Sequence, residues 1–500
     1  MDLLNAAIIS RNSGGSSIGE GSHVGTTDIS GLSETLQSWA TAQNAIGQET
    51  NALLSLIAQA VSEDASGQIT DFQTIQSYLR AGQISRILSV GDQLRVNRLD
   101  TVSATVSGNI TAAAVDAEAF LTMTQHPETT AFTFTYDGTG WSMRDASGTV
   151  RPAELAAYGI TVTGTPAAND VITVHETAST LLWDVLGVDC DTPADPHHTH
   201  TLTLGLHDCA ASLMFDAREA LFHFAEGLSA GTYNFTVTEH SWVPGDENKT
   251  FQFTLTQDIP AGGQLVLDVA YNVTIADSTA KTYSGAASAT EIETVTITEG
   301  SGGTSLGEVS NTIANGANSL QRALNGNGNY GESAIRQYLN SAAAAGSVWT
   351  ARNAWDRAPS WNASTAGFLR GLDKAFLSVI GEVTKKTALN TVCEANDDTT
   401  STEKVFLLSR SEVYGGKEVT GGEGAAYPYY SDYSALNAAG MNADSNRVKY
   451  KNGAAFFWWL RTPFASNANG VRGVNSEGVV NYTTANNGSS KGVAPACCIV

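Results

Sequence analysis

Two short motifs of the sequence have the form that serine hydrolases use to present a nucleophile. Gly-x-Ser-x-Gly occurs at 227–231 and at 303–307, which makes Ser229 and Ser305 the candidate nucleophiles. In α/β-hydrolases the catalytic histidine follows the serine along the chain, and the last histidine of this sequence is His240. This order excludes Ser305, and Ser229 lies in an alternating β pattern without parallel strand–helix–strand units. We therefore interpret both motifs as Gly/Ser turns and identify no catalytic residue.

A second cluster of reactive side chains lies in the segment DCDTPADPHHTH, at residues 189–200. On a strand, His198 and His200 would share one face, so both imidazoles could reach one zinc or iron ion. The alternative is a polar loop that runs into a strand, with Pro193 and Pro196 setting the turn. We favour the loop and expect no metal and no cofactor, with His198 and His200 as the candidate ligands if a metal does bind.

Charge and composition exclude several classes of function. The formal net charge is -23, which argues against nucleic acid and against an anionic membrane surface as a partner. No apolar run is long enough to insert across a bilayer. The N-terminus has an acid at position 2 and lacks the basic start of a secretory signal, so we expect synthesis in the cytoplasm. The five cysteines show no zinc-ligand spacing and are expected to be buried free thiols.

The N-terminal region, residues 1–83, reads as a polar arm followed by helices. Between Leu32 and Ala60 mostly apolar residues recur at alternating spacings of four and three, which predicts an amphipathic helix of about four heptads. A second helix is predicted within residues 69–83, with Asp71 as its N-cap. Either an oligomeric coiled coil or an intramolecular helical hairpin would bury the apolar seam.

From residue 84 to 298 the period of the pattern changes to two. Segments such as AFTFTYDGTGWSM, at 131–143, alternate apolar and polar residues around Gly, Asp and Pro turns, which predicts an all-β sandwich or jelly roll. The portion 104–178 is predicted to be an inserted β module. It interrupts two segments, SVGDQLRV and LLWDVLGVDC, that read as parts of one sheet.

The remaining chain is predicted to be a linker with a helix at 299–325 and an α+β domain at 326–500. Heptad-like spacing from Leu306 to Leu324 predicts the linker helix. A helix around residues 335–339 and another around 369–380, opened by Ser364 or Thr365, precede several strands. In the last hairpin, GVRGVNSEGVVN, we expect a turn through 475–478. A bulge at Gly473 is also expected, because Val471 and Val474 would otherwise point to opposite faces.

The C-terminal region resembles the C-type-lectin-fold variable proteins of diversity-generating retroelements, of the major-tropism-determinant type, in the version common in phages and prophages of gut Firmicutes. The resemblance is carried by SAIRQYLNS (333–341), GFLRGLDKAFLSVIG (367–381), KVFLLSRSEVYGG (404–416), YPYYSDYS (427–434), WWLRTP (458–463) and GVAPACCI (492–499). The segment at 191–208, with AGTYNFT at 230–236, also resembles the tail-associated β-domain that precedes this lectin module. The resemblance implies a C-type-lectin-like fold for 326–500.

The resemblance also implies a variable, ligand-binding surface between two buried strands. The retroelement misreads template adenines, so asparagine codons mark the randomised positions, which here are Asn467, Asn469, Asn475, Asn481, Asn486 and Asn487. Altered products in the same window are Phe464, Gly470, Arg472, Gly473, Ser476, Tyr482, Thr483, Thr484, Ser489 and Ser490. The fixed frame would be Val471, Val474, Gly478, Gly492, Val493, Ala494 and Pro495. Exposed positions on a fixed backbone change at little cost in stability.

The function that the resemblance implies is host recognition by a non-enzymatic receptor-binding protein of the virion, at the distal end of a phage tail. Its partners would be a bacterial surface protein or glycan and other tail proteins, and the N-terminal region would assemble a homotrimer and attach it to the virion. Two alternatives stay open. One is a structural tail-fibre or baseplate protein with a non-variable lectin-like cap. The other is an enzyme, either a glycan-depolymerising tailspike or a relative of the formylglycine-generating enzyme.

Overall fold

The computed structural model describes residues 71–116, 120, 131–144, 150–238, 248–267, 282–288, 292–310, 316–394, 398–416, 422–430, 445–487 and 491–500. In this part of the chain strands predominate over helices and form several sheets, so the protein is a multidomain, β-rich molecule. None of the helices in these ranges is long and apolar enough to cross a membrane. The predicted helix between Leu32 and Ala60, and with it the predicted trimer contact, lies outside the described residues.

A nine-stranded sheet joins segments that lie far apart in the sequence. Its order is β18-β28-β9-β7-β3-β4-β5, with β1 beside β7 and β21 beside β28. The bounds are β1 Gln93–Ser107, β3 Ala131–Tyr136, β4 Trp141–Arg144, β5 Val150–Pro152, β7 Val171–Val188, β9 Leu202–Leu206, β18 Ile380–Gly381, β21 Val405–Phe406 and β28 Ala496–Ile499. Because β28 pairs antiparallel with β9, the regions predicted as 84–298 and 326–500 share this sheet.

Helix α3 (Phe72–Arg80) covers the end of the chain. It begins at the predicted cap, Asp71, whose carboxylate accepts hydrogen bonds from the backbone N–H groups of Gln73 and Thr74. Its Phe72 ring lies 5.2 Å from that of Phe376 in α7 (Lys374–Val379), and Gln76 Nε2 donates to the Val500 carbonyl at 2.7 Å. One hydrophobic cluster therefore includes residues of α3, β7, β9, α7 and β28.

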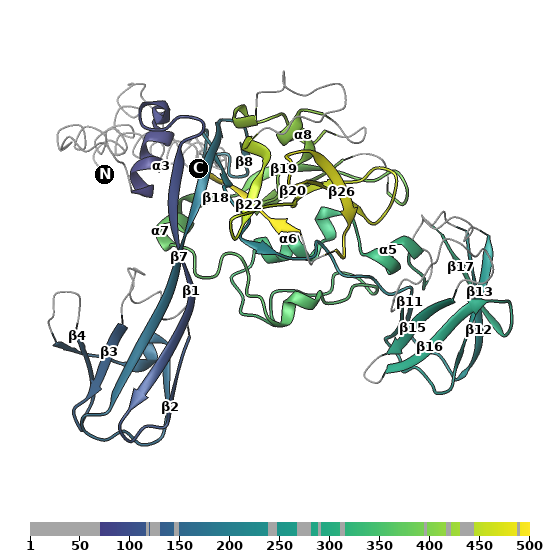
Figure 1. Cartoon of the computed structure of the whole chain (residues 1–500), viewed down its shortest axis with the longest axis horizontal. Helices are drawn as coiled ribbons and strands as arrows, with labels where there is room; N and C mark the ends of the chain where they lie inside the picture. The colour runs from purple at the N-terminus through teal and green to yellow at the C-terminus, as the bar shows by residue number, and fades with distance from the viewer. Residues whose placement is uncertain are drawn as a thin grey trace, which may run out of the picture.

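The long strands β1 and β7 leave this cluster together and enter a separate one. Between them lie β2 (Ala112–Val115), η2 (Leu155–Tyr158) and β6 (Ile160–Thr163), in addition to β3, β4 and β5. The second cluster contains Ile110, Phe120, Phe134, Leu155, Ile160, Ile172 and Val174. The described residues between 102 and 174 thus fold around their own core, seen at the lower left of Figure 1, where the β1–β7 ribbon enters it.

A third cluster belongs to a seven-stranded sheet of order β11-β14-β15-β16-β13-β12-β17. The bounds are β11 Phe222–Phe224, β12 Gly231–Val237, β13 Lys249–Leu255, β14 Gly263–Leu267, β15 Thr282–Ser288, β16 Ile292–Glu299 and β17 Thr304–Val309, with α5 (Leu320–Asn325) packed against it. The predicted helix from Leu306 to Leu324 is wrong for its first residues, Leu306 to Val309. Residues 304–309 instead form β17, because pairing with the edge of β12 outweighs the local heptad pattern.

The C-terminal region adds a five-stranded sheet of order β10-β27-β24-β25-β26. Its bounds are β10 Ala211–Ser212, β24 Trp458–Pro463, β25 Gly470–Val474, β26 Val480–Thr484 and β27 Gly492–Val493. Around it lie η1 Ile84–Arg86, β8 Thr192–Pro193, η3 Tyr330–Glu332, α6 Ala334–Leu339, η4 Ser360–Ala363, β19 Val383–Ala388, β20 Asp398–Glu403, α8 Arg410–Tyr414, η5 Pro428–Tyr430, η7 Ser445–Arg447, β22 Lys449–Lys451 and β23 Ala454–Phe456. Helix α7 is capped by Asp373, so the predicted start at Ser364 or Thr365 is wrong.

The burial of the two C-terminal cysteines is set by the alternation of side chains along their strand. Cys497 and Cys498 in β28 are buried in two different clusters, because adjacent strand residues point to opposite faces. All five cysteines are free thiols, as expected, but Cys190 is exposed and Cys393 is half-buried.

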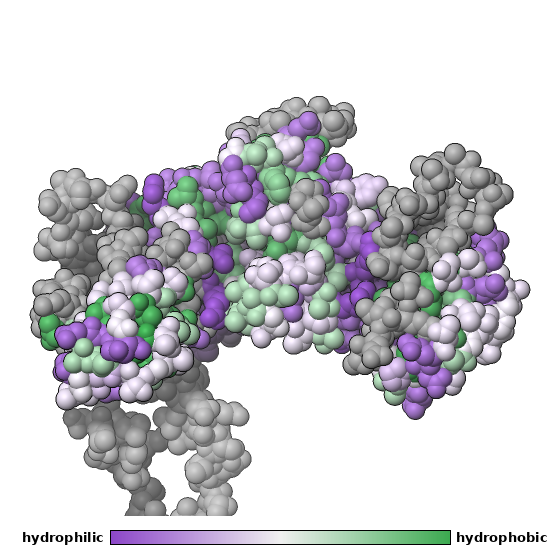
Figure 2. Space-filling model, turned by 60° about the horizontal axis from the view of Figure 1, so that its bottom comes forward, coloured by the Kyte–Doolittle hydropathy of each residue, from purple (hydrophilic) through white to green (hydrophobic). Residues whose placement is uncertain are grey.

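Over the face in Figure 2, hydrophilic and hydrophobic residues of the described chain are interspersed.

Excision of the inserted core tests whether it is independent. Thr101 and Thr177 face each other in the β1–β7 ladder, so Asn-Gly can replace residues 102–176 as a two-residue hairpin turn. We expect the shortened chain to keep a cooperative thermal transition close to that of the full chain, measured by circular dichroism, because the residues removed belong to the separate cluster. Loss of cooperative unfolding would show that the two cores depend on each other.

Candidate functional site

Strands β24 and β25 are buried on both faces and hold the predicted variable window in place. Trp459 and Val471 pack into the cluster that contains α3 and β28, whereas Trp458 and Val474 pack into the cluster beneath α8. The indole N–H groups donate to the carbonyls of Arg447 and Leu213, each at 2.9 Å. The bulge predicted at Gly473 does not lie in β25, which pairs with β26 in regular register and, in a sheet covered on both faces, buries both valines. The irregularity lies in the facing strand β24, whose register shifts between Trp459, opposite Gly473, and Pro463, opposite Val471.

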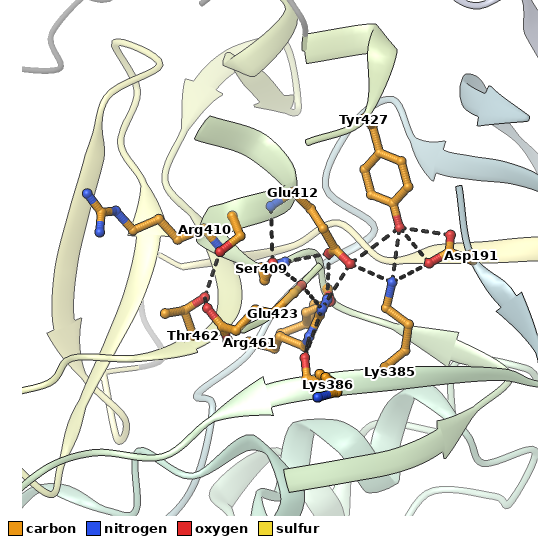
Figure 3. A network of polar contacts seen from close by, with 12 residues as sticks. Asp191, Lys385, Lys386, Ser409, Arg410, Glu412, Glu423, Tyr427, Arg461 and Thr462 are labelled. Carbon is orange, nitrogen blue, oxygen red and sulfur yellow. Dashed lines mark hydrogen bonds and ion pairs between the residues drawn. The ribbon is translucent and has the colours of Figure 1, made fainter. Parts of the chain in front are cut away.

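A buried ion pair fixes β24 to helix α8. Arg461 is fully buried, and its guanidinium donates to both carboxylate oxygens of Glu412, at 2.6 and 2.9 Å (Figure 3). The same guanidinium also donates to the backbone carbonyls of Lys386, Leu407 and Glu423. A bidentate pair with all remaining donors satisfied is the geometry that makes a buried charge tolerable.

Glu412 serves a second purpose at the start of α8. Its carboxylate accepts from the backbone N–H of Ser409 at 2.8 Å, while the Ser409 hydroxyl accepts from the backbone N–H of Glu412, which completes a capping box. Burial opposes ionisation of this carboxyl, but the Arg461 and Lys385 cations outweigh it and hold the pKa of Glu412 below its usual value.

Lys385 in β19 connects Glu412 to Asp191 and Tyr427, which lie far from it in the sequence. Its ammonium group donates to Asp191 at 2.6 Å, to Tyr427 Oη at 3.0 Å and to Glu412. Asp191 also accepts from the Tyr427 hydroxyl at 2.9 Å and from that of Thr203 at 2.6 Å. Burial works against the Asp191 anion, yet Lys385 keeps the pKa of Asp191 below its usual value.

This network lines a cavity of about 150 Å³, and its charges are matched within it. Arg461, Glu412 and Tyr427 come from three of the stretches that carried the resemblance, and no sequence pattern indicated that they meet. Their chemistry is structural, because each cation is already saturated by carboxylates, carbonyls or a phenol. Nor do the described residues contain a group of three or more His, Cys, Asp or Glu that could hold a metal ion.

His198 and His200 do not share a strand face, contrary to the geometry that a shared metal requires. Both precede β9, which begins at Leu202. The Nε2 atom of His198 lies 4.0 Å from Asp195, whereas His200 Nδ1 lies 3.0 Å from Asp189. The segment is therefore the polar loop of the alternative interpretation, and each imidazole is paired with a different aspartate.

Three residues of the predicted variable window form an aromatic cluster with a cation. The rings of Phe464 and Tyr482 stack with their centroids 4.0 Å apart and an interplanar angle of 11°. The Arg472 guanidinium lies 4.6 Å from the Phe464 centroid and 5.7 Å from that of Tyr482. Tyr482 is 46% exposed, whereas Phe464 and Arg472 are half-buried, so the cluster presents mainly the amphipathic tyrosine ring to solvent.

The other predicted positions divide by exposure. Two of them are exposed, Ser476 and Asn481, and three are buried, Asn469, Gly470 and Gly473. Six are half-buried: Asn467, Asn475, Thr483, Thr484, Asn486 and Asn487. Ser489 and Ser490 lie outside the described residues. The turn at 475–478 forms as predicted, with the Asn475 carboxamide oxygen accepting from the backbone N–H groups of Glu477 and Val479. Asn475 therefore shapes the hairpin as well as lying on it.

The three buried positions belong to the frame and not to the displayed surface. Asn469 is 2% exposed, and its amide donates to the Gln321 carbonyl at 3.3 Å. A Cβ atom on Gly473 would lie 2.2 Å from the Phe457 ring, and one on Gly470 would lie 2.3 Å from the Asn467 carboxamide. Side chains at these glycines would clash with their neighbours, so we expect glycine to be retained at both positions, although the resemblance placed them among the altered products.

A groove that no sequence pattern indicated lies at the end of β26. Its volume is about 490 Å³, and its lining consists of Ser212, Leu213, Met214, Ser360, Trp361, Asn486 and Asn487. Only the two asparagines belong to the predicted window. The other five come from segments that meet only in the folded chain.

Comparison with known proteins gives one match. Residues 307–500 match the family described as "Domain of unknown function (DUF6273)". The matched region contains Lys385, Glu412, Tyr427 and Arg461 of the buried network, together with the whole variable window. No curated protein and no solved structure matches the chain.

Removal of the buried guanidinium tests the structural role of the network. Arg461→Met keeps much of the volume but leaves Glu412 without its bidentate partner, so we expect a loss of about 3–5 kcal/mol in the free energy of unfolding. Urea denaturation followed by tryptophan fluorescence measures it. The control is Lys386→Met, which removes a surface pair of 3.5 Å with Asp398 and should cost about 1 kcal/mol or less. Equal losses in the two variants would contradict this role.

Proposed function

We propose that the protein is a receptor-binding protein of a phage tail, which recognises a bacterial surface ligand through residues 464–487 of a C-type-lectin-like C-terminal domain. The observation that carries the proposal is the stacked cluster of half-buried Phe464, half-buried Arg472 and exposed Tyr482, beside strands whose backbone is held by buried tryptophans. All three residues were predicted ligand-binding positions.

The chemistry of this cluster suits recognition better than catalysis. Tyrosine, asparagine and serine supply adaptable hydrogen bonds and rigid rings in antibody paratopes, and aromatic residues with arginine are enriched at binding hot spots. Here Tyr482 and Asn481 are exposed on β26, and Ser476 lies in the adjoining turn. A surface that is already ordered before binding loses little conformational entropy when the ligand arrives.

The separation of frame and surface also supports variation by a retroelement. Phe464, Arg472, Tyr482 and Asn481 can change side chain without disturbing a buried cluster, whereas Gly470 and Gly473 cannot. We propose that the first group is diversified and that the second, with Asn469, is constant. Assembly as a homotrimer through the N-terminal region would multiply weak single contacts, because linked sites raise avidity by about 10² to 10⁴.

Binding to cells tests the proposal directly. Fluorescently labelled full-length protein is added to a panel of gut Firmicutes strains and detected by flow cytometry. We expect Tyr482→Ala to lower binding to the recognised strain about tenfold or more, as truncation of an interface hot spot does. Tyr450 is the matched control, since it is 43% exposed but lies outside the window, and Tyr450→Ala should bind like the unaltered protein. Binding to no strain, or equal loss in both variants, would contradict the proposal.

The coding DNA separates a diversified receptor reader from a structural tail protein with a constant cap. We expect a near-identical DNA repeat close to the region that encodes residues 464–490, with the differences confined to template adenines. Sequencing of the flanking DNA measures this. Differences spread evenly over all four bases, or absence of any repeat, would favour the structural protein.

A further inference from the structure

The groove at the end of β26 is built from three separate segments. Strand β10 and the residues after it supply one side, from Ser212 to Met214. The first turn of η4 supplies Ser360 and Trp361, and the chain after β26 supplies Asn486 and Asn487. A volume of about 490 Å³ lies within the range of about 300–1,000 Å³ found for sites that bind small molecules.

The walls of the groove are fixed by hydrogen bonds between these segments and the core. The indole N–H of Trp361 donates to the Met214 carbonyl at 3.2 Å, and that of Trp459 donates to the Leu213 carbonyl at 2.9 Å. The Trp361 ring also meets Tyr338 edge to face at 5.8 Å. A ligand would therefore enter a preformed site and would not have to order a loop.

The lining combines apolar surface with groups that both donate and accept hydrogen bonds. Leu213, Met214 and Trp361 are apolar, whereas the other lining residues carry hydroxyls or carboxamides, and none of the seven carries a charge. A hydroxyl and a carboxamide each offer donor and acceptor positions. Sugar hydroxyls have the same dual character and lie around a ring with apolar C–H faces, so this lining matches a neutral saccharide.

The two asparagines are oriented and still have hydrogen-bonding capacity. Asn486 Oδ1 accepts from the Thr484 hydroxyl at 3.0 Å, and its Nδ2 donates to the Leu324 carbonyl at 3.4 Å. Asn487 Nδ2 donates to the Thr483 hydroxyl at 3.1 Å. A carboxamide has two N–H donors and two acceptor positions, so these contacts hold the groups in place without using all of them.

Charge favours a neutral ligand over an acidic one. The chain carries a formal net charge of -23, which repels anionic sugars at long range. None of the seven lining residues supplies a cation that would compensate within the groove. Arg472, the cation of the aromatic cluster, is not among them.

We infer that this groove binds one neutral sugar residue of a bacterial surface glycan. The inference deepens the proposed function and rests on it. Five of the seven lining residues lie outside the variable window, so most of the groove would be common to all variants, while Asn486 and Asn487 would adjust its polar contacts to the sugar. The window would then distinguish the linkages and substituents around that sugar.

The test uses the full chain and an array of immobilised saccharides. Neutral members are glucose, galactose, mannose, rhamnose, N-acetylglucosamine and N-acetylgalactosamine, and acidic members are glucuronic acid and sialic acid. We expect binding to at least one neutral sugar and none to the acidic pair. Asn487→Asp, which places a carboxylate in the groove, and Ser360→Trp, which fills it, should each weaken that binding about tenfold or more.

Controls separate this inference from the proposed function. Asn248→Asp makes the same change of charge at an exposed turn of the seven-stranded domain and should leave saccharide binding unchanged. Circular dichroism establishes that each variant is folded. If both groove variants bind sugars and cells like the unaltered chain while Tyr482→Ala does not bind cells, the groove inference fails and the proposed function stands. If every one of these variants still binds sugars and cells like the unaltered chain, both the groove inference and the proposed function fail. If the unaltered chain prefers the acidic sugars, only the groove inference fails.

Discussion

The bidentate ion pair between Arg461 and Glu412 is the constraint on which the C-terminal region depends. Two charges that are removed from water must find each other with good geometry, or their burial costs several kcal/mol. Satisfying Arg461 therefore requires β24 to lie against α8, and β24 also carries Trp458 and Trp459. The position of the displayed hairpin follows from this pairing, since β25 forms its ladder on the same strand.

Sequence patterns correctly predicted the features that are set by interactions between residues close in the chain, such as the positions of helices α3 and α6. The start of α3 at Asp71 was predicted because an N-cap acts within one turn, and α6 was predicted because its apolar residues follow a helical period. The network around Glu412 was not predicted, because its partners come from distant segments and no short-range rule joins them. The same limit explains the error at residues 304–309, where an open strand edge overrode a heptad pattern.

The candidate site shows the same division. That Phe464, Arg472 and Tyr482 belong to one surface could be predicted from the resemblance, but their stacking depends on the register of β25 and β26. The steric restriction at Gly470 and Gly473 also depends on register, because the atoms that exclude a side chain there belong to residues that are neighbours in space. Composition alone cannot distinguish a glycine that is free to change from one that is confined.

The place of β28 in the nine-stranded sheet has a consequence for synthesis of the chain. Its partner β9 ends at Leu206, and β28 begins at Ala496, so the 289 residues from 207 to 495 must be translated between them. At bacterial elongation rates of roughly 5–20 residues per second, the ribosome needs about 15–60 s for this stretch. During that interval the edge of β9 has no partner and can pair with other nascent chains. The inserted module and the seven-stranded domain are complete before the sheet closes, so one strand edge stays open on a chain whose other domains can already fold.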